Sequence, residues 1–348
     1  MRRSFIRTVL CALPVLALVS LGPGYASPTQ DTGGRAHTWS ADWPKTDFSR
    51  HAAPLQEIES VVPKDAIPSI DDPQFVPVGE VRLEENRGGG SKRTLTLSER
   101  DPVISVEING DARAYPLRIM MYHEIVNDVV GGEPVVVTYC PLCNTGLVFD
   151  RVIDGAPTEF GVSGKLRKSS LIMYDRRTES WWQQYTGEAI VGAMAGRKLE
   201  RRVTRLESFK SFARRYPEGS VLTPNDPSAA PYGRNPYLSY DSERRPFLYR
   251  GGMPKGIEPL ARVVVVDDTA YSLALLSEEG EIVDGDIRLS WEEGQASALD
   301  TARISEGREV GDVVVQRRTA DGEWRDIAHD VVFAFVFHAF KPDGEWRL

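Results

Sequence analysis

Short alternating runs of apolar residues, separated by tight turns, are the feature that most limits how this chain can fold. Residues 103–108 alternate as a strand does, Asn109-Gly110 supplies a hairpin turn, and the alternation resumes at 112–115. Helical patterns are few and short, with examples at 116–126 and 207–216. We therefore expect a mainly β or α+β architecture in which many short strands are joined by turns.

A faint internal repeat adds a second constraint on the fold. The segment 263–324 follows the same order of predicted elements as the segment 103–158. Ala114-Tyr115-x-Leu117 returns as Ala270-Tyr271-x-Leu273, and Glu124-Ile125-Val126 returns as Glu281-Ile282-Val283. The chain is therefore expected to contain two related β-rich halves. Near its end, residues 331–340 are predicted to form a further apolar strand.

The first residues predict that the protein is exported. Three arginines precede an apolar stretch at 9–21, and Gly24-Tyr25-Ala26 offers a cleavage site, which is the pattern of a secretory signal peptide. No later stretch reaches the roughly 18 apolar residues of a membrane span. We expect a secreted or periplasmic protein that is soluble once the signal peptide is removed. The predicted regions are a signal peptide at 1–26, a flexible leader at 27–52, a cysteine-bearing half at 53–258 and a second copy without cysteines at 259–348.

The charge of the chain bears on its partners. The formal net charge is −8, and cleavage after Ala26 would remove three arginines and no acidic residue. A chain this acidic is a poor match for nucleic acid, so none is expected as a partner.

One pair of cysteines remains after such cleavage, because Cys11 lies within the signal peptide. Cys140 and Cys143 follow the apolar strand predicted at 134–139 and form a Cys-x-x-Cys sequence. The residues after the pair read as strand, whereas in thioredoxin-like proteins this motif begins a long helix. A thioredoxin fold is therefore not expected, although redox chemistry on another scaffold is compatible with the pattern.

Three chemistries fit this pair. In the first, the pair is a thiol/disulfide redox centre in which Cys140 attacks and Cys143 resolves, and no cofactor is required. In the second, both thiolates and His123 hold copper or zinc. In the third, the pair forms a structural disulfide, although so short a ring stabilises little through chain entropy. The redox partner or small-molecule substrate is left open by the sequence.

His123 is the best candidate companion of the cysteines, since a neutral imidazole can bind a metal or move a proton. The alternative is a histidine that only holds loop backbone by hydrogen bonds. Its neighbours Glu124, Asn127 and Asp128 are candidate binding residues, but an aspartate here also suits a turn.

A second candidate region lies beyond the cysteines and is rich in polar and aromatic residues. Tryptophan rings can stack on a planar ligand, and an arginine can bind a carboxylate through two hydrogen bonds. The competing interpretation is an exposed turn between strands. The candidate binding residues are Ser163, Tyr174, Asp175, Arg176, Trp181 and Trp182.

Several motifs together resemble the secreted proteins grouped as domain of unknown function 3179, and the resemblance runs from about Pro63 to Trp346. It implies a reactive sulfur or selenium centre, because some relatives carry selenocysteine within the motif that matches Cys140 to Cys143. It implies no established activity. The motifs are 112–117, 123–128, 138–151, 160–164, 173–176, Asn235-Pro236-Tyr237 and the closing stretch 335–346.

Overall fold

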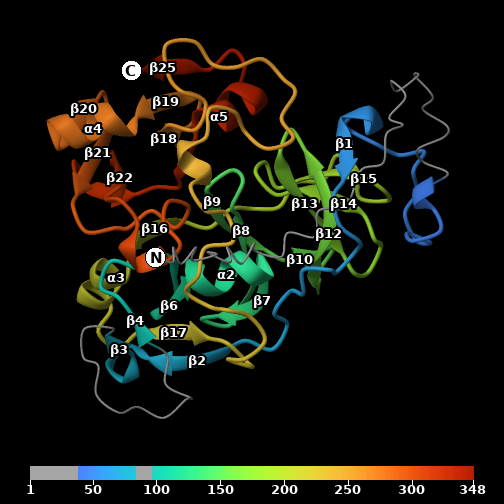
Figure 1. The fold of residues 1–348 in the computed structure, drawn as a ribbon, viewed down its shortest axis with the longest axis horizontal. Helices are drawn as coiled ribbons and strands as arrows, with labels where there is room; N and C mark the ends of the chain where they lie inside the picture. Colours follow the sequence, from blue (N-terminus) through green and yellow to red (C-terminus); the bar gives the residue numbers. More distant parts are fainter. Residues whose placement is uncertain (1–37, 84–95) are drawn as a thin grey trace, which may run out of the picture. The chain divides into compact units, whose positions relative to one another are not determined.

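The computed structural model describes residues 38–83 and 96–348, so the predicted signal peptide and residues 27–37 lie outside the described residues. The fold is β-rich with short helices, as predicted (Figure 1). The α-helices that lie wholly within the described residues each have seven residues. They are α2 (Leu117–His123), α3 (Phe209–Arg215), α4 (Leu273–Glu279) and α5 (Ala334–Phe340), and the 3-10 turns are Leu55–Glu57, Val78–Glu80, Tyr240–Ser242 and Ile304–Glu306.

A five-stranded sheet contains the first predicted hairpin. Asn109 and Gly110 both have positive φ, 52° and 84°, which is the backbone of the tight hairpin turn expected from their identities. Strand β17 pairs in parallel with β6, and the other neighbours are antiparallel. The strand order is β16 (Thr204–Ser208), β5 (Pro102–Ile108), β6 (Asp111–Pro116), β17 (Ser220–Thr223) and β2 (Gln74–Pro77).

The next sheet carries the cysteines and has three antiparallel strands. Helix α2 ends at His123 because Glu124 takes the left-handed conformation, with φ 57°, and turns the chain into β7. The central strand is buried from residue 135 onward, as its continuous apolar sequence requires. The strands are β7 (Ile125–Val130), β8 (Glu133–Cys140) and β9 (Thr145–Asp150).

A third sheet follows and contains the second candidate region. Its hairpin β12–β13 is irregular between Val162 and Lys165, where the register shifts. The strand order is β1 (Ile58–Ser60), β12 (Phe160–Arg167), β13 (Ser170–Asp175), β14 (Trp181–Gln183) and β15 (Glu188–Val191). Two short pairs accompany these sheets, β10 (Val152–Ile153) with β11 (Ala156–Pro157), and β3 (Arg82–Leu83) with β4 (Thr96–Leu97).

The C-terminal part repeats the order of elements seen in the first two sheets. A hairpin of two strands leads into a short helix and then into further antiparallel strands. The strands on either side of helix α5, β24 and β25, each pair with one strand of this hairpin, as β16 and β17 do in the first sheet. One sheet has the order β24 (Asp330–Phe333), β18 (Arg262–Val266), β19 (Thr269–Ser272) and β25 (Glu345–Arg347). The other has β20 (Glu281–Asp284), β21 (Ile287–Glu292), β22 (Asp312–Arg318) and β23 (Trp324–Asp326). The proposed boundary at residue 258 stays a prediction.

One large hydrophobic core joins elements from both parts of the chain. It includes Ile104 of β5, Val136 of β8 and Phe160 of β12, together with Val263 of β18 and Phe337 of α5. The cysteines belong to this core as well. Their chemistry is therefore set in an environment with little access for water.

Two segments differ from the sequence-based expectation. Residues 38–52, expected to be part of a flexible leader, pack on the third sheet because Trp39 and Trp43 are buried against Trp181. Residues 331–340, expected to be one strand, form the end of β24 and then helix α5. A continuous apolar run suits a buried helix as well as a buried strand, so its sequence could not separate the two.

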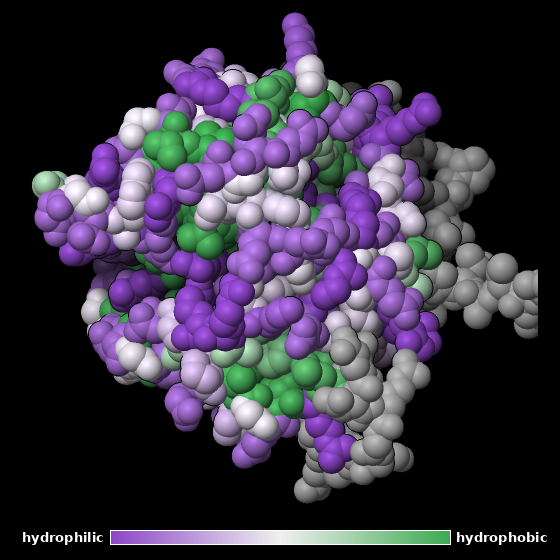
Figure 2. All heavy atoms as spheres, turned by 90° about the vertical axis from the view of Figure 1, so that its left-hand side faces the viewer, coloured by the Kyte–Doolittle hydropathy of each residue, from purple (hydrophilic) through white to green (hydrophobic). Residues whose placement is uncertain are grey.

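Within residues 38–83 and 96–348, no helix combines the length and apolar character needed to cross a membrane. Figure 2 shows the face that carries α4 and β20–β22, where hydrophilic side chains predominate and apolar ones gather in small separate groups. That distribution is ordinary for a surface in contact with water.

Candidate functional site

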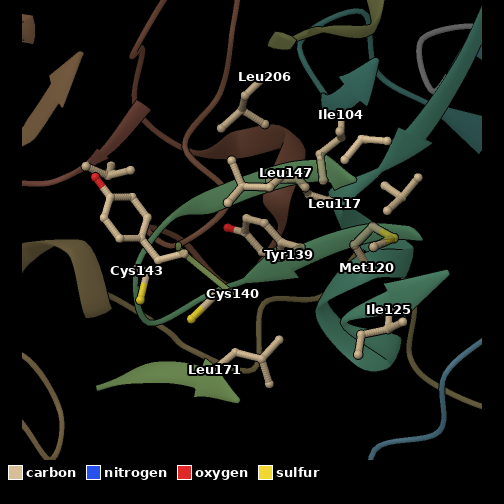
Figure 3. Packing of buried hydrophobic residues seen from close by; sticks show 14 of the residues in the cluster. Ile104, Leu117, Met120, Ile125, Tyr139, Cys140, Cys143, Leu147, Leu171 and Leu206 are labelled. Atoms are coloured by element: carbon tan, nitrogen blue, oxygen red, sulfur yellow. The ribbon is translucent and has the colours of Figure 1, made fainter. Parts of the chain in front are cut away.

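The two cysteines lie at either end of a tight turn that joins β8 to β9. Cys140 is the last residue of β8 and pairs in register with Thr145, the first residue of β9. The backbone N–H of Cys143 donates to the Cys140 carbonyl at 3.1 Å, and Asn144 closes the turn with φ 54°. This turn brings both sulfur atoms to the same side of the hairpin, near Leu171, as Figure 3 shows.

Hydrogen bonds to two other segments, strand β24 and the segment around Tyr240, hold this turn. The Asn144 side chain donates to the Val331 carbonyl at 3.0 Å, and the Phe333 N–H donates to the Cys143 carbonyl at 3.1 Å. The Tyr240 hydroxyl donates to the Leu142 carbonyl at 3.1 Å. The turn is therefore fixed by β24 and covered by the segment that contains Tyr240.

Both thiols are free and almost completely buried, with 1% of Cys140 and 0% of Cys143 exposed. Burial raises the pKa of the Cys143 thiol, and its hydrogen bond and charge interaction with Cys140 raise it further. The Cys143 sulfur also lies 3.4 Å from the Ser169 carbonyl, to which its S–H donates. Cys143 is therefore a protonated thiol in the neutral pH range.

Tyrosines surround the cysteine pair, and sequence reasoning assigned none of them a role. Burial raises the pKa of Tyr139, Tyr185, Tyr237 and Tyr240, and a charge on Cys140 or Cys143 contributes to each increase. The hydroxyls of Tyr139 and Tyr185 are buried and have no hydrogen-bond partner among the described residues. Unpaired buried hydroxyls are uncommon in folded proteins, so these two tyrosines distinguish the surroundings of the cysteine pair.

Glu124 adds an unpaired carboxyl group to this neighbourhood. Its side chain is buried, with 7% of the residue exposed, and burial raises its pKa to about 8. It forms no ion pair within the described part of the chain. Tyr237 is close enough to both Glu124 and Cys140 for their charges to raise its pKa. Glu124 is therefore largely protonated at pH 7, and Tyr237 lies near both its carboxyl group and Cys140.

His123 is held by other contacts. Its Nδ1 lies 2.8 Å from the Pro68 carbonyl, and its Nε2 lies 2.7 Å from the Tyr232 hydroxyl. Burial lowers the pKa of His123, which keeps the ring neutral. Across residues 38–83 and 96–348, no three histidine, cysteine or acidic side chains are grouped so that they could hold a metal ion. Both ring nitrogens thus have partners other than the thiols.

Asn127 and Asp128 serve the structure around β7. The Asn127 amide donates to the Phe160 carbonyl and accepts from the Phe160 N–H, both at 2.8 Å. Asp128 receives two hydrogen bonds from Arg113, at 2.7 and 2.9 Å, and one from the Tyr115 hydroxyl at 2.5 Å. Their polar groups are therefore engaged within the fold.

The second candidate region divides between core and surface. Trp181 and Trp182 are buried, and the Trp182 indole donates to Asp175 at 3.0 Å. The Ser163 hydroxyl donates to the Ile172 carbonyl at 2.5 Å. These four side chains thus hold the third sheet together.

Tyr174 and Arg176 face a polar hollow of about 520 Å³ instead. Tyr174 donates to Asp65 at 2.5 Å, and Arg176 forms an ion pair with Asp71 at 2.7 Å. These partners belong to the proline-rich segment before β2. The polar contacts around the hollow therefore hold that segment against the third sheet.

Part of the cysteine environment could have been found from the sequence, and part could not. Tyr139 adjoins Cys140, and Tyr237 lies in one of the motifs singled out above. Tyr185, Ser169 and Tyr240 carry no comparable signal, because only the folded chain brings them to the turn.

A β-rich protein with a buried pair of cysteines in a hairpin turn is the class that these features define. Residues 64–344 match the family described as Protein of unknown function (DUF3179), and the chain belongs to that family. The resemblance noted from the motifs is thereby confirmed at the level of the family. No curated protein and no solved structure matches the chain.

Proposed function

We propose that this protein is a secreted or periplasmic thiol redox protein in which Cys140 and Cys143 alternate between dithiol and disulfide. The observation that carries the proposal is the pair of free thiols on one side of a fixed turn, close enough for the charge and hydrogen bond of Cys140 to act on Cys143. The amino-terminal sequence supports the compartment.

The two thiols have different roles in this proposal. Because the pKa of the Cys143 thiol is raised, Cys140 is the attacking thiol and Cys143 the resolving one. Cys140 gives up its proton, and its thiolate attacks one sulfur of a small disulfide; the departing thiolate takes up that proton and leaves as one thiol. Cys143 then gives up its proton and attacks the Cys140 sulfur in the mixed disulfide, and the second departing thiolate takes up this proton and leaves as the second thiol. Two electrons and two protons thus pass from the protein to the small disulfide.

The burial of the pair limits the electron acceptor. With 1% of Cys140 and 0% of Cys143 exposed, no disulfide reaches either sulfur in this conformation. The proposed reaction therefore requires the segment around Tyr240 to move away, and the proposed acceptor is a low-molecular-weight disulfide because it needs the smaller opening.

A redox titration tests the proposal directly. The mature protein is equilibrated with glutathione buffers, and its free thiols are counted alongside those of Cys140→Ser and Cys143→Ser. We expect a reversible two-electron transition with a reduction potential above about −300 mV. A potential below about −300 mV would instead indicate a permanent structural disulfide.

Metal analysis of the same preparation tests the alternative chemistry. The redox proposal predicts no stoichiometric copper or zinc by mass spectrometry. Stoichiometric metal that is lost in both Cys140→Ser and His123→Ala would favour the copper or zinc module.

A further inference from the structure

A hollow of about 350 Å³ lies beside helix α2 and involves none of the residues assigned to the thiol site. Three arginines line it, Arg118, Arg234 and Arg303, together with the hydroxyl-bearing residues Tyr232, Thr96 and Ser305. None of the described residues that line it is acidic. This concentration of positive charge is unusual in a chain whose formal net charge is −8.

Backbone pairing places two of these arginines directly opposite each other. Arg234 and Arg303 form an isolated antiparallel bridge. The N–H of Asn235 donates to the Ala302 carbonyl at 3.0 Å, and the N–H of Ile304 donates to the Gly233 carbonyl at 3.1 Å. The two arginines are thus the pair between those hydrogen bonds, the arrangement in which facing side chains come closest. Like charges in such positions destabilise the pairing.

The third arginine comes from α2 and is fixed. The guanidinium of Arg118 pairs with Asp101 and donates to the Thr96 carbonyl at 2.7 Å. It lies against Gly233, where an added Cβ would be 3.3 Å from Arg118 Nη1 and where φ is +88°. Glycine is required there both by the backbone and by the approach of the arginine.

The existing ion pairs leave positive charge in the hollow. Asp101 offsets Arg118, and Glu306 lies 3.5 Å from Arg303 with 62% of its side chain exposed. Exposed pairs of this kind contribute little. Among the described residues, none forms an ion pair with Arg234.

We propose that this hollow binds a small oxyanion that carries at least two negative charges, either a phosphate group or a multiple carboxylate. Guanidinium groups bind both through paired hydrogen bonds, and the bound anion would offset the repulsion between Arg234 and Arg303. A volume of about 350 Å³ is in the range of small-molecule sites. The hydroxyl of Ser305 would supply a further polar contact.

Calorimetric titration of the mature protein with inorganic phosphate and, separately, with citrate tests this site. We expect at least one probe to bind, and binding should weaken by about tenfold or more in Arg234→Gln and in Arg303→Gln, because each removes a charged hydrogen-bonding partner. The probe that binds more tightly identifies phosphate or carboxylate as the preferred group. Arg325→Gln is the matched control, since Arg325 is an exposed arginine on β23 outside the hollow. This variant should bind each probe as tightly as the wild type does.

Thermal melting separates a binding role from a structural one. Without a probe, Arg234→Gln and Arg303→Gln should melt at or above the wild-type temperature, because each relieves repulsion between like charges. With a probe concentration that saturates the wild type, the wild type should gain stability and the two variants should gain less. Millimolar phosphate and citrate that both fail to bind, or equal affinity in all four proteins, would overturn the proposal.

Discussion

Among single residues, Glu124 stands out because the fold keeps its carboxyl group buried and unpaired. Its backbone adopts φ 57°, which is unfavourable for a residue with a side chain, and burial raises its pKa from 4.5 to about 8. Both features cost stability, and neither is compensated by an ion pair in the described chain. Groups kept in such settings are often functional, which agrees with the position of Glu124 near Tyr237 and Cys140.

The raised pKa of Glu124 predicts a specific dependence of stability on pH. In the unfolded chain this carboxyl loses its proton near pH 4.5, whereas in the folded protein it keeps the proton up to about pH 8. The free energy of unfolding should therefore fall as pH rises between these two values. The loss from this residue is at most about 5 kcal/mol, taking 1.36 kcal/mol for each pKa unit.

Glu124→Gln should abolish that part of the pH dependence, because the amide stays neutral. Urea unfolding of wild type and variant at about pH 5 and about pH 8 measures the difference. The variant should gain stability relative to the wild type at the higher pH. Glu133→Gln, a substitution at an exposed position at the start of β8, should leave the wild-type dependence intact. Parallel pH profiles for all three proteins would show that Glu124 is not protonated in the fold.

Single residues also show how far the sequence alone could reach. The sequence singles out Cys140 and Cys143 as a candidate site through their spacing, and the structure adds that both lie in one buried turn. The contacts of His123 could not be predicted, since its partners Pro68 and Tyr232 lie 55 and 109 residues away in the chain. Sequence pattern carries no record of such long-range hydrogen bonds.

At the level of elements, the turn between β8 and β9 distinguishes the first half of the chain from the second. Residues 141–144 suffice to connect these strands, whereas residues 293–311 connect β21 to β22. In that longer connection Glu309 accepts hydrogen bonds from the N–H groups of Gly294 and Gln295, at 3.0 and 2.9 Å. The connection between β8 and β9 is thus a short turn with two thiols, whereas the corresponding connection between β21 and β22 is a long loop held by the carboxylate of Glu309.

The cover over the thiol turn gives an element-scale prediction. The Tyr240 hydroxyl donates to the Leu142 carbonyl at 3.1 Å and accepts from the Phe247 N–H at 3.3 Å. Tyr240→Phe removes both bonds, at a cost of about 1 kcal/mol, which should raise the population of open conformations about fivefold. Alkylation of the cysteines by iodoacetamide, followed by mass spectrometry, should accelerate to the same extent.

A tyrosine in the second half supplies the matched control. The Tyr271 hydroxyl donates to Asp284 at 3.0 Å and has no contact with the thiol turn. Tyr271→Phe should therefore leave the alkylation rate of the cysteines unchanged. Equal rates in both variants would mean that the segment around Tyr240 does not limit access.

Strands and hairpins could be predicted from the sequence where the residues of a turn determine its backbone conformation. Asn109-Gly110 and Asp154-Gly155 mark hairpins because their backbones adopt positive φ, and both turns are present. The helix α5 was missed because its core-facing sequence, Ala334–Phe340, is apolar on most sides. Burial by the surrounding sheets, rather than a local pattern, decides between helix and strand there.

For the molecule as a whole, residues 38–52 are part of the packed structure rather than a leader attached to it. Trp43 is 1% exposed, and its ring meets Trp181 and Tyr174 edge to face at 5.2 and 5.0 Å. Lys64 lies 4.7 Å from the centre of the same ring. The segment thereby covers the face of the third sheet that the main core does not reach.

Trp43→Ala should therefore destabilise the whole protein by about 3–5 kcal/mol, which is the usual cost of removing a buried tryptophan. Because Trp181 is adjacent to Trp182 on β14, and Trp182 belongs to the main core, the loss should appear as a lower midpoint of global unfolding. Urea denaturation followed by tryptophan fluorescence and by circular dichroism measures it. His51→Ala is the control, because His51 is exposed and lies in the same segment. If Trp43→Ala unfolded at the same urea concentration as His51→Ala, the segment would contribute nothing to the fold, and residues 38–52 would be the flexible leader that their composition suggests.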